Sequence, residues 1–156
     1  MVWRGICHSN SKCINSTTMK KIFHTIIEAL HDGEVKNYAA DEENGIVDFY
    51  VEGTKATYHV HLYADEKQEL LLCWTLFPIK VPIDRIPDIC TILNRINDTN
   101  IVTALVVAPE DGMLQCRFPC TVDDGAVNKK IVAAAICNTI TCFEQNYNEI
   151  VKGTTG

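Results

Sequence analysis

Apolar residues recur at spacings of three and four positions in three stretches of the chain, and this period predicts three helices. Ser16 or Thr17 can cap the first helix through a side-chain oxygen. Asp32-Gly33 is expected to end it, with Gly33 in the left-handed conformation that often follows a helix. The apolar face of this helix consists of Met19, Ile22, Phe23, Ile26, Ile27 and Leu30.

The second and third helices are predicted in the middle and at the end of the chain. Because proline is tolerated only in the first helical turn, Pro87 places the cap of the second helix near Asp84. Asp123 or Asp124 is expected to cap the third helix, and Gly153 to close it. The apolar face of the third helix is formed by Val132, Ile136, Ile140, Phe143, Tyr147 and Ile150.

Alternating or continuous apolar runs between these helices predict strands. Five main strands are expected at residues 46–51, 56–62, 69–77, 101–107 and 113–118, with a short edge strand at residues 35–40. In the second of the five, His59 and His61 alternate with apolar residues and share the polar face. The third is apolar on both faces, which places it in the centre of the sheet and Trp74 in the core.

Turn residues between the strands indicate hairpins, at Asn44-Gly45 and again at residues 109–112. Hairpin connections imply antiparallel pairing. The predicted fold class is therefore α+β, with three helices packed on an antiparallel sheet of about five strands in the order α-β-β-β-α-β-β-α. Residues 16–153 are expected to form a single domain, preceded by a flexible N-terminal arm, residues 1–15, in which no periodicity is visible.

The composition agrees with one globular domain and disfavours some classes of binding partner. The chain has 156 residues, of which 47% are hydrophobic and 22% charged, so its core needs no metal or disulfide. The formal net charge is −6, which disfavours nucleic acid and anionic membrane surfaces as partners. No apolar run approaches the roughly 20 residues of a membrane helix. The N-terminus has no signal-peptide pattern.

Eight cysteines are the one unusual count. An even number is compatible with disulfides, but without an export signal a reducing, cytoplasmic location is favoured. Several cysteines lie within apolar patterns, where a free cysteine acts as a small buried hydrophobe. Neither Cys116 and Cys120 nor Cys137 and Cys142 has the Cys-x-x-Cys spacing of a redox pair, although Cys116 and Cys120 share one face of a strand.

Two groups of residues resemble parts of a metal site. His59 and His61 share a strand face and could ligate a metal, but the sequence defines no third ligand, for which Asp65 and Glu66 are the nearest candidates. The second group consists of Cys7, His8 and Cys13. Both sets are incomplete, so we expect no bound metal and no cofactor.

No catalytic residue is predicted. The chain contains no glycine-rich phosphate loop, no G-x-S-x-G and no H-E-x-x-H motif. A cysteine–histidine nucleophile pair depends on spatial contact, which a sequence does not define. A Cys- or metal-dependent enzyme of unknown reaction therefore stays open as the alternative function.

The order of elements over most of the chain resembles that of a known family. Val81-Pro82 precedes a helix that carries Leu93-Asn94-Arg95-Ile96-Asn97, and a β-hairpin through Asp111-Gly112 and a long terminal helix follow. This order resembles the YbjN family of bacterial proteins, often described as sensory-transduction regulators, over roughly residues 17–152. Asn94 and Asn97, late in their helix, are expected to bond the turn that follows rather than a partner's backbone.

The resemblance implies the fold of type III secretion chaperones, a twisted antiparallel sheet with helices packed on it. Proteins of this shape are small, acidic, usually dimeric, and bind other polypeptides. It therefore implies a non-enzymatic protein-binding module, a chaperone-like adaptor or regulator of bacterial signalling or secretion, whose partner is another protein or peptide segment. The short first helix and the eight cysteines depart from the pattern.

A homodimer is expected to form through the second helix or the hairpin after it. The isoleucines of this helix cover more of its circumference than one core-facing stripe requires, and a surplus apolar surface usually marks an interface. The predicted partner or dimer interface consists of Ile83, Ile86, Ile89, Ile92 and Ile96. The alternative is that the terminal helix covers Ile92 within the same chain.

Overall fold

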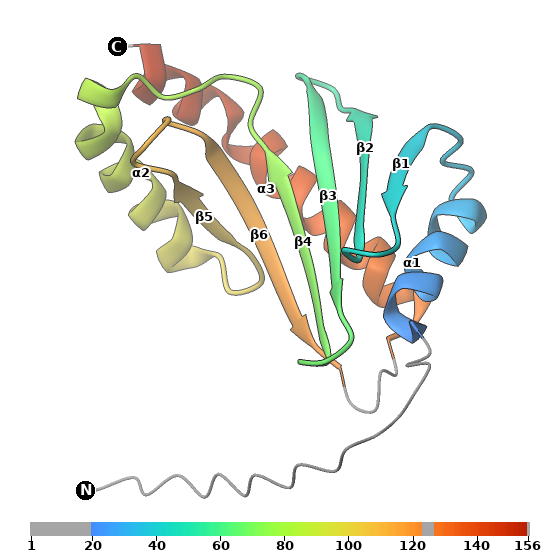
Figure 1. Ribbon diagram of the computed structural model, residues 1–156. Helices are drawn as coiled ribbons and strands as arrows, with labels where there is room; N and C mark the ends of the chain where they lie inside the picture. The colour runs from blue at the N-terminus through green and yellow to red at the C-terminus, as the bar shows by residue number, and fades with distance from the viewer. Residues whose placement is uncertain (1–19, 123–126, 156) are drawn as a thin grey trace, which may run out of the picture.

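The computed structural model describes residues 20–122 and 127–155. Within these residues the chain forms three α-helices, one short 3₁₀-helix and six strands (Figure 1). In chain order the elements are α1 (Lys21–Asp32), β1 (Tyr38–Asp41), β2 (Ile46–Glu52), β3 (Thr57–Asp65), β4 (Leu70–Leu76), η1 (Ile83–Arg85), α2 (Ile86–Thr99), β5 (Ala104–Val107), β6 (Leu114–Thr121) and α3 (Lys129–Thr155). The predicted arm, residues 1–15, lies outside the described residues.

The six strands form one sheet in the order β1-β2-β3-β4-β6-β5, and every neighbouring pair is antiparallel. β2, β3 and β4 pair in succession, so the predicted antiparallel arrangement of residues 46–77 is confirmed. The sheet has one strand more than the five main strands predicted, because the edge strand expected at residues 35–40 pairs with β2 as β1. β4 lies between β3 and β6, the central place predicted for it.

The three helices cover one face of the sheet. α3 contacts β4 and β6 at the middle of the sheet, α1 and α2 each pack against α3, and Figure 1 shows α3 running behind the strands. α1 belongs to one apolar cluster and α2 to a second, and α3 contributes residues to both. α3 therefore joins the two halves of the core. Among the described helices, none combines the length and the apolarity that crossing a membrane requires.

The side of α3 that meets the sheet is centred on small residues. Its buried positions include Val132, Ala135, Thr139, Cys142, Phe143 and Ile150. The predicted face included the larger Ile136, Ile140 and Tyr147, which are only half-buried. Thr139 Oγ1 lies 2.7 Å from Thr75 Oγ1 on β4, and both hydroxyls are buried. Because a buried hydroxyl is costly without a partner, this bond fixes where α3 lies on β4.

The start of α1 and the residue that follows it differ from the prediction. α1 begins at Lys21, and the predicted caps Ser16 and Thr17 lie outside the described residues. The helix ends at Asp32 as predicted, but Gly33 has φ −81°, so it is not left-handed. Glu34 takes the left-handed conformation instead, with φ +56°.

The described part of α3 is capped by a residue that the sequence analysis did not single out. Asn128 Oδ1 accepts a hydrogen bond of 3.0 Å from the backbone N–H of Ile131, the bond that an N-cap residue makes. The predicted caps, Asp123 and Asp124, lie outside the described residues.

Gly153 does not close α3, because the helix continues to Thr155. It serves instead as a point of close packing between α3 and α2. A Cβ atom at this position would lie 2.4 Å from Ile92 Cδ1 and 2.8 Å from Ile89 Cδ1. Only glycine permits this approach without displacing the isoleucines.

The prediction that Trp74 lies in the core is wrong. Along β4, Leu71, Cys73 and Thr75 are fully buried toward the helices, and the alternate residues point to the other face. Trp74 is one of these alternate residues and is half-buried. The sequence pattern was apolar on both faces, and the helices cover only one of them.

Truncation of Trp74 should therefore cost less than truncation of a residue under α3. Phe143 is fully buried between Tyr58 and Phe77, so Phe143→Ala should lower the free energy of unfolding by about 3–5 kcal/mol. Trp74→Ala should lower it by less than about 2 kcal/mol, since only part of the indole leaves water on folding. Urea denaturation of both variants measures the difference. Equal losses would place Trp74 in the core after all.

Candidate functional site on the open face of the sheet

The face of the sheet turned away from the described helices carries an apolar centre. We call it the open face. Its central apolar residues all come from β4 and are half-buried. This apolar strip consists of Leu70, Leu72, Trp74 and Leu76. Antiparallel pairing places Leu72 beside Tyr63 of β3 on one side and Pro119 of β6 on the other. The apolar strip therefore lies at the centre of the open face, with β3 on one side and β6 on the other.

Four rings form a continuous row of contacts across the open face from β2 to β4. Tyr50 stacks on His59 with ring centroids 4.3 Å apart, and His59 lies 4.0 Å from His61. His61 stacks in turn on Trp74 at 5.0 Å, with the rings within 8° of parallel. We call Tyr50, His59, His61 and Trp74 the ring ladder. Tyr50, at its outer end, is 67% exposed and available for contact.

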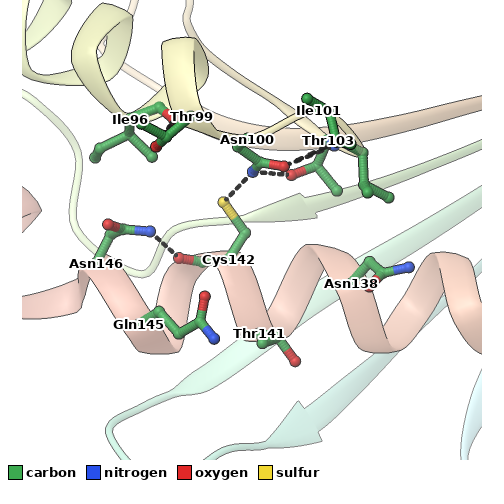
Figure 2. Close-up of a pocket in the computed structure, with 11 residues that line it drawn as sticks. Ile96, Thr99, Asn100, Ile101, Thr103, Asn138, Thr141, Cys142, Gln145 and Asn146 are labelled. Atoms are coloured by element: carbon green, nitrogen blue, oxygen red, sulfur yellow. Dashed lines mark hydrogen bonds between the residues drawn. The ribbon is translucent and has the colours of Figure 1, made fainter.

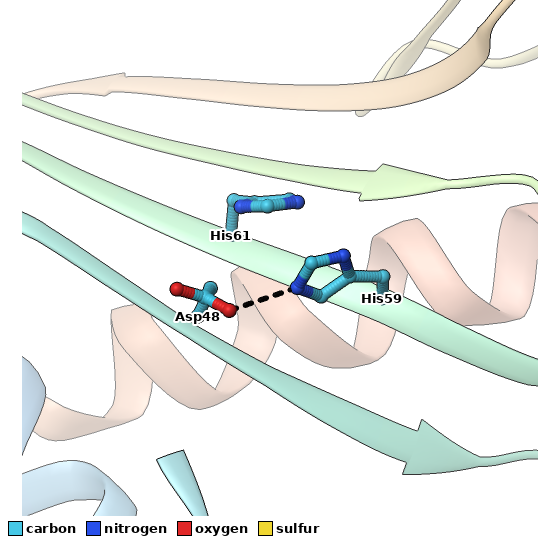
Figure 3. A group of neighbouring side chains, drawn as sticks. All are labelled: Asp48, His59 and His61. Carbon is cyan, nitrogen blue, oxygen red and sulfur yellow. Dashed lines mark hydrogen bonds and ion pairs between the residues drawn. The ribbon is translucent and has the colours of Figure 1, made fainter. Parts of the chain in front are cut away.

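Asp48 of β2 lies against the two histidines of the ring ladder (Figure 3). Asp48 is the direct partner of His61 in the register of β2 and β3, and its Oδ1 lies 2.9 Å from His59 Nε2. Burial, followed by the nearby His59, lowers the pKa of His61 below its ordinary value. The structure thus brings together the predicted pair, His59 and His61, and adds an acid that the sequence analysis did not consider. The adjacent predicted strands at residues 46–51 and 56–62 were the available signal, but they do not define which of their residues lie opposite one another.

The acids suggested as third ligands are engaged elsewhere. Asp65 Oδ1 accepts hydrogen bonds from the backbone N–H groups of Lys67 and Gln68, which holds the turn after β3. Glu66 Oε1 accepts a bond of 3.0 Å from the backbone N–H of Phe23, near the start of α1. Neither belongs to the Asp48, His59 and His61 group.

A hollow lies at the end of the open face where β2 and β4 finish. It is lined by Tyr50, Thr57, His59, Leu76, Phe77, Pro78, Lys80 and Met113. The lining includes Tyr50 and His59 of the ring ladder and Leu76, the last residue of the apolar strip. The open face therefore offers aromatic, aliphatic and one basic side chain around a single depression.

A second pocket lies between the C-terminal end of α2 and the middle of α3 (Figure 2). Eleven residues line it and none of them carries a charge or an imidazole. Cys142 is the nucleophilic group there, and Asn100 Nδ2 lies 3.2 Å from its Sγ. The same amide group also contacts Thr103 Oγ1 at 2.6 Å.

Neighbouring polar groups favour the thiolate form of Cys142. The Cys116 thiol, Thr103 and Asn100 together outweigh burial and hold the pKa of Cys142 below its ordinary value. The contact with Cys142 and burial raise the pKa of Cys116. A cysteine catalyst also needs a base to take up a proton, and the described lining of this pocket supplies neither a histidine nor a carboxylate.

The other described cysteines and Asn97, which the sequence analysis discussed, have structural positions. Cys116 faces the helices and is buried next to Cys142, not paired with Cys120. Cys137 is exposed on α3. Asn97 Oδ1 accepts a bond of 2.8 Å from the Leu105 N–H near the start of β5, and Asn97 Nδ2 donates one of 2.9 Å to the Leu105 carbonyl, which is the local role expected for it. Cys7, His8 and Cys13 lie outside the described residues.

The isoleucines of the predicted interface divide between the core and the surface. Ile89 and Ile96 are buried against the protein's own core, and Ile92 is half-buried against Gly153 of α3. Ile83 is 58% exposed, and Ile86 is half-buried. Ile83 is thus the most exposed of the five residues, and Ile86 and Ile92 keep part of their surface exposed.

Two solved structures share this fold. One is the HopA1–SchA chaperone–effector complex, in which the matching chain is 15% identical, with a TM-score of 0.58 over 81% of this chain and 94% of that one. The other is the ExsC–ExsE complex, with 16% identity and a TM-score of 0.60 over 81% of this chain and 90% of that one. The protein therefore has a chaperone-like α+β fold, which confirms the predicted fold class. Identities this low establish the fold alone.

The chain belongs to the YbjN family. The family model, described as "Putative bacterial sensory transduction regulator", matches residues 24–152, which confirms the resemblance drawn from the sequence. No curated protein matches the chain.

The contact between Asn100 and Cys142 predicts a change in thiol reactivity. Asn100→Asp keeps the Oδ1 atom that accepts bonds from the Val102 and Thr103 N–H groups but replaces the donor next to Cys142 with a second oxygen. The pKa of Cys142 should then rise, because a carboxylate disfavours the thiolate. Alkylation by iodoacetamide between about pH 6 and pH 9, read by peptide mass spectrometry, should be half-maximal at a higher pH.

The exposed Cys137 is the internal reference for this measurement, since its alkylation should not depend on Asn100. An unchanged pH profile at Cys142 in the variant would show that Asn100 does not stabilise its thiolate.

Proposed function

We propose that this protein is a non-enzymatic protein-binding module, a chaperone-like adaptor or regulator that holds a segment of another protein on the open face of its sheet. The observation that carries the proposal is the apolar strip at the centre of that face. Leucine and tryptophan side chains in the middle of a sheet, with no described helix over them, leave apolar surface that a partner can bury.

The strip and the ring ladder have the composition of a binding centre. Aromatic residues dominate the binding energy of many interfaces, because they remove a large area from water with few torsions to fix. Trp74 belongs to both groups, and Tyr50 extends the aromatic surface to the rim. Completing the burial of the three half-buried leucines and Trp74 would remove the apolar area that they still expose, and each Å² contributes about 25 cal/mol. Because association itself is costly, the affinity also depends on how well the partner fits this surface.

The comparisons support the same proposal. One neighbour of this fold was solved as a chaperone with its effector and the other as a complex of two proteins. The net charge of −6 favours a protein partner over nucleic acid or an anionic membrane. The family description supports a role in bacterial signalling, and the chaperone–effector neighbour supports a chaperone-like role.

The alternative of a Cys-dependent enzyme gains less support. Cys142 has a depressed pKa, but its pocket has no described base, and contacts with the Cys116 thiol, Thr103 and Asn100 account for this shift without a catalytic role. We also place the module in the reducing cytosol, on the grounds that the described cysteines are free thiols and that three of them are buried structural groups.

Substitution of the apolar strip should abolish partner capture. Leu72→Glu puts a charge at the centre of the open face, where it would be buried without a counter-ion under a bound segment. Ile101→Glu makes the same change of side chain at a position that is 96% exposed and remote from the open face, so it is the matched control. Each protein is used for affinity capture from its own cells, followed by mass spectrometry.

A protein retained by the wild type and by Ile101→Glu but lost with Leu72→Glu supports the proposal, once its direct binding is reproduced with purified components. Circular dichroism checks that the Leu72 variant is folded. A specific partner that binds folded Leu72→Glu as tightly as the wild type would refute the open face as its site.

We propose further that the module is a homodimer, with the accessible end of the second helix in the interface. Ile83, in η1 just before α2, is the most exposed member of the predicted set, Ile86 next to it is half-buried, and Ile89 and Ile96 point inward. In a twofold pair the same patch meets itself, so that one substitution acts twice.

Ile83→Glu should therefore convert a dimer to a folded monomer, measured by light scattering at tens of micromolar. Ile92→Glu is unsuitable for this purpose, because Ile92 packs on Gly153 and a charge there would disturb the contact between α2 and α3. A wild type that is monomeric, or an Ile83→Glu variant that stays dimeric, would each reject this interface.

A further inference from the structure

Three side chains with metal-binding atoms converge on the open face from two strands. Asp48 comes from β2, and His59 and His61 come from β3. Alternation along the strands puts all three on the same face, and the register sets Asp48 directly opposite His61. His59 lies one step diagonally away, opposite Tyr50. The pairing of two adjacent strands, rather than any loop, therefore holds the group together.

The distances within this group suit a single ion. One ligand atom from each residue lies within 4.8 Å of the other two. Zinc binds nitrogen and oxygen at about 2.0–2.1 Å, which places the ligands of a tetrahedral site about 3.3 Å apart. The 2.9 Å between Asp48 Oδ1 and His59 Nε2 is already near this value, and side-chain rotation would bring in the atom of His61, which lies within 4.8 Å of both. Figure 3 shows the three side chains on the same side of the two strands.

One ring nitrogen of His61 has no hydrogen-bond partner in the part of the chain that the structure describes. His61 Nε2 is buried and makes no hydrogen bond within the described residues. A buried ring nitrogen without a partner is costly, and a metal ion satisfies it. Asp48 Oδ1, in contrast, already contacts His59 Nε2, an arrangement that an incoming ion would replace.

The ring ladder holds the imidazoles in place. His61 lies between His59, at 4.0 Å, and the indole of Trp74, at 5.0 Å and nearly parallel to it. His59 is stacked on its other side by Tyr50 at 4.3 Å. Rings fixed by stacking lose little further freedom when they bind an ion, which is the arrangement that a preorganised site needs.

We propose that Asp48, His59 and His61 form a binding site for one divalent transition-metal ion, with at least one coordination position left open. Two imidazoles and a carboxylate suit zinc and its neighbours in the first transition series rather than calcium or magnesium. The open position is available to water or to a donor from a bound protein. The inference goes beyond the proposed function and does not depend on it, and it departs from the expectation of no metal because the strand register supplies a third ligand.

The test is metal binding by the full chain, purified without a polyhistidine tag and stripped with EDTA. Titration with Zn²⁺, followed by calorimetry, should give one ion per chain. His61→Phe keeps a ring against Trp74 but removes the ligand atom, and Asp48→Asn keeps the shape of the side chain but removes its charge. Each should raise Kd by at least about 100-fold, since even changes behind the ligands cost roughly 10–100-fold.

His31→Gln is the matched control, because His31 is an imidazole on α1 that contacts Tyr38 and lies outside the group. All variants retain the eight cysteines, so zinc bound by thiols is the same in each. Co²⁺ gives a second readout in a Trp3→Phe background, where it should quench the fluorescence of Trp74 without the near-ultraviolet absorption of thiolate-bound cobalt.

Loss of the ion in His61→Phe and Asp48→Asn, with retention in His31→Gln, supports the site. Binding that is equal in all four proteins, or cobalt spectra with thiolate absorption, would assign the ion to cysteines and overturn the proposal. Absence of binding at tens of micromolar Zn²⁺ would overturn it as well.

Discussion

The packing of α3 against the middle of the sheet holds this molecule together. α1 and α2 belong to different apolar clusters, and α3 is the element that contributes to both. Its buried centre consists of small side chains, which let the helix approach the strands closely. The Thr75–Thr139 hydrogen bond lies in this contact, and since the Thr75 hydroxyl is buried away from water, sliding α3 along β4 would leave that hydroxyl without its partner.

This packing also decides what the other face of the sheet becomes. With α3 and its two neighbours on one side, the alternate residues of β4 point away from every described helix. A central strand that is apolar on both faces is typical of a sheet covered on both sides. Here the second set forms the apolar strip instead, and the ring ladder crosses from Trp74 toward β2. The candidate binding surface and the candidate metal site thus both result from one-sided coverage.

Local patterns predicted most of the fold and only parts of the site. Apolar residues that recur every two positions predicted the strands, and those that recur every three to four predicted the helices, because each element buries one face. The same patterns could not tell which of two apolar faces a helix covers, so Trp74 was assigned to the core. Asp48 was missed for a related reason. It lies 13 positions before His61 in the chain and becomes its neighbour only through the pairing of β2 with β3.

The sequence by itself determined the element order, the antiparallel hairpins and the family, because these depend on residue patterns within a few positions of one another. Only the tertiary structure decided which isoleucines of α2 face inward, which thiol meets Cys142, and which acid joins His59 and His61. Each of these depends on contacts between segments distant in the chain. Such contacts follow from how α3 and the strands pack, and no local period encodes that packing.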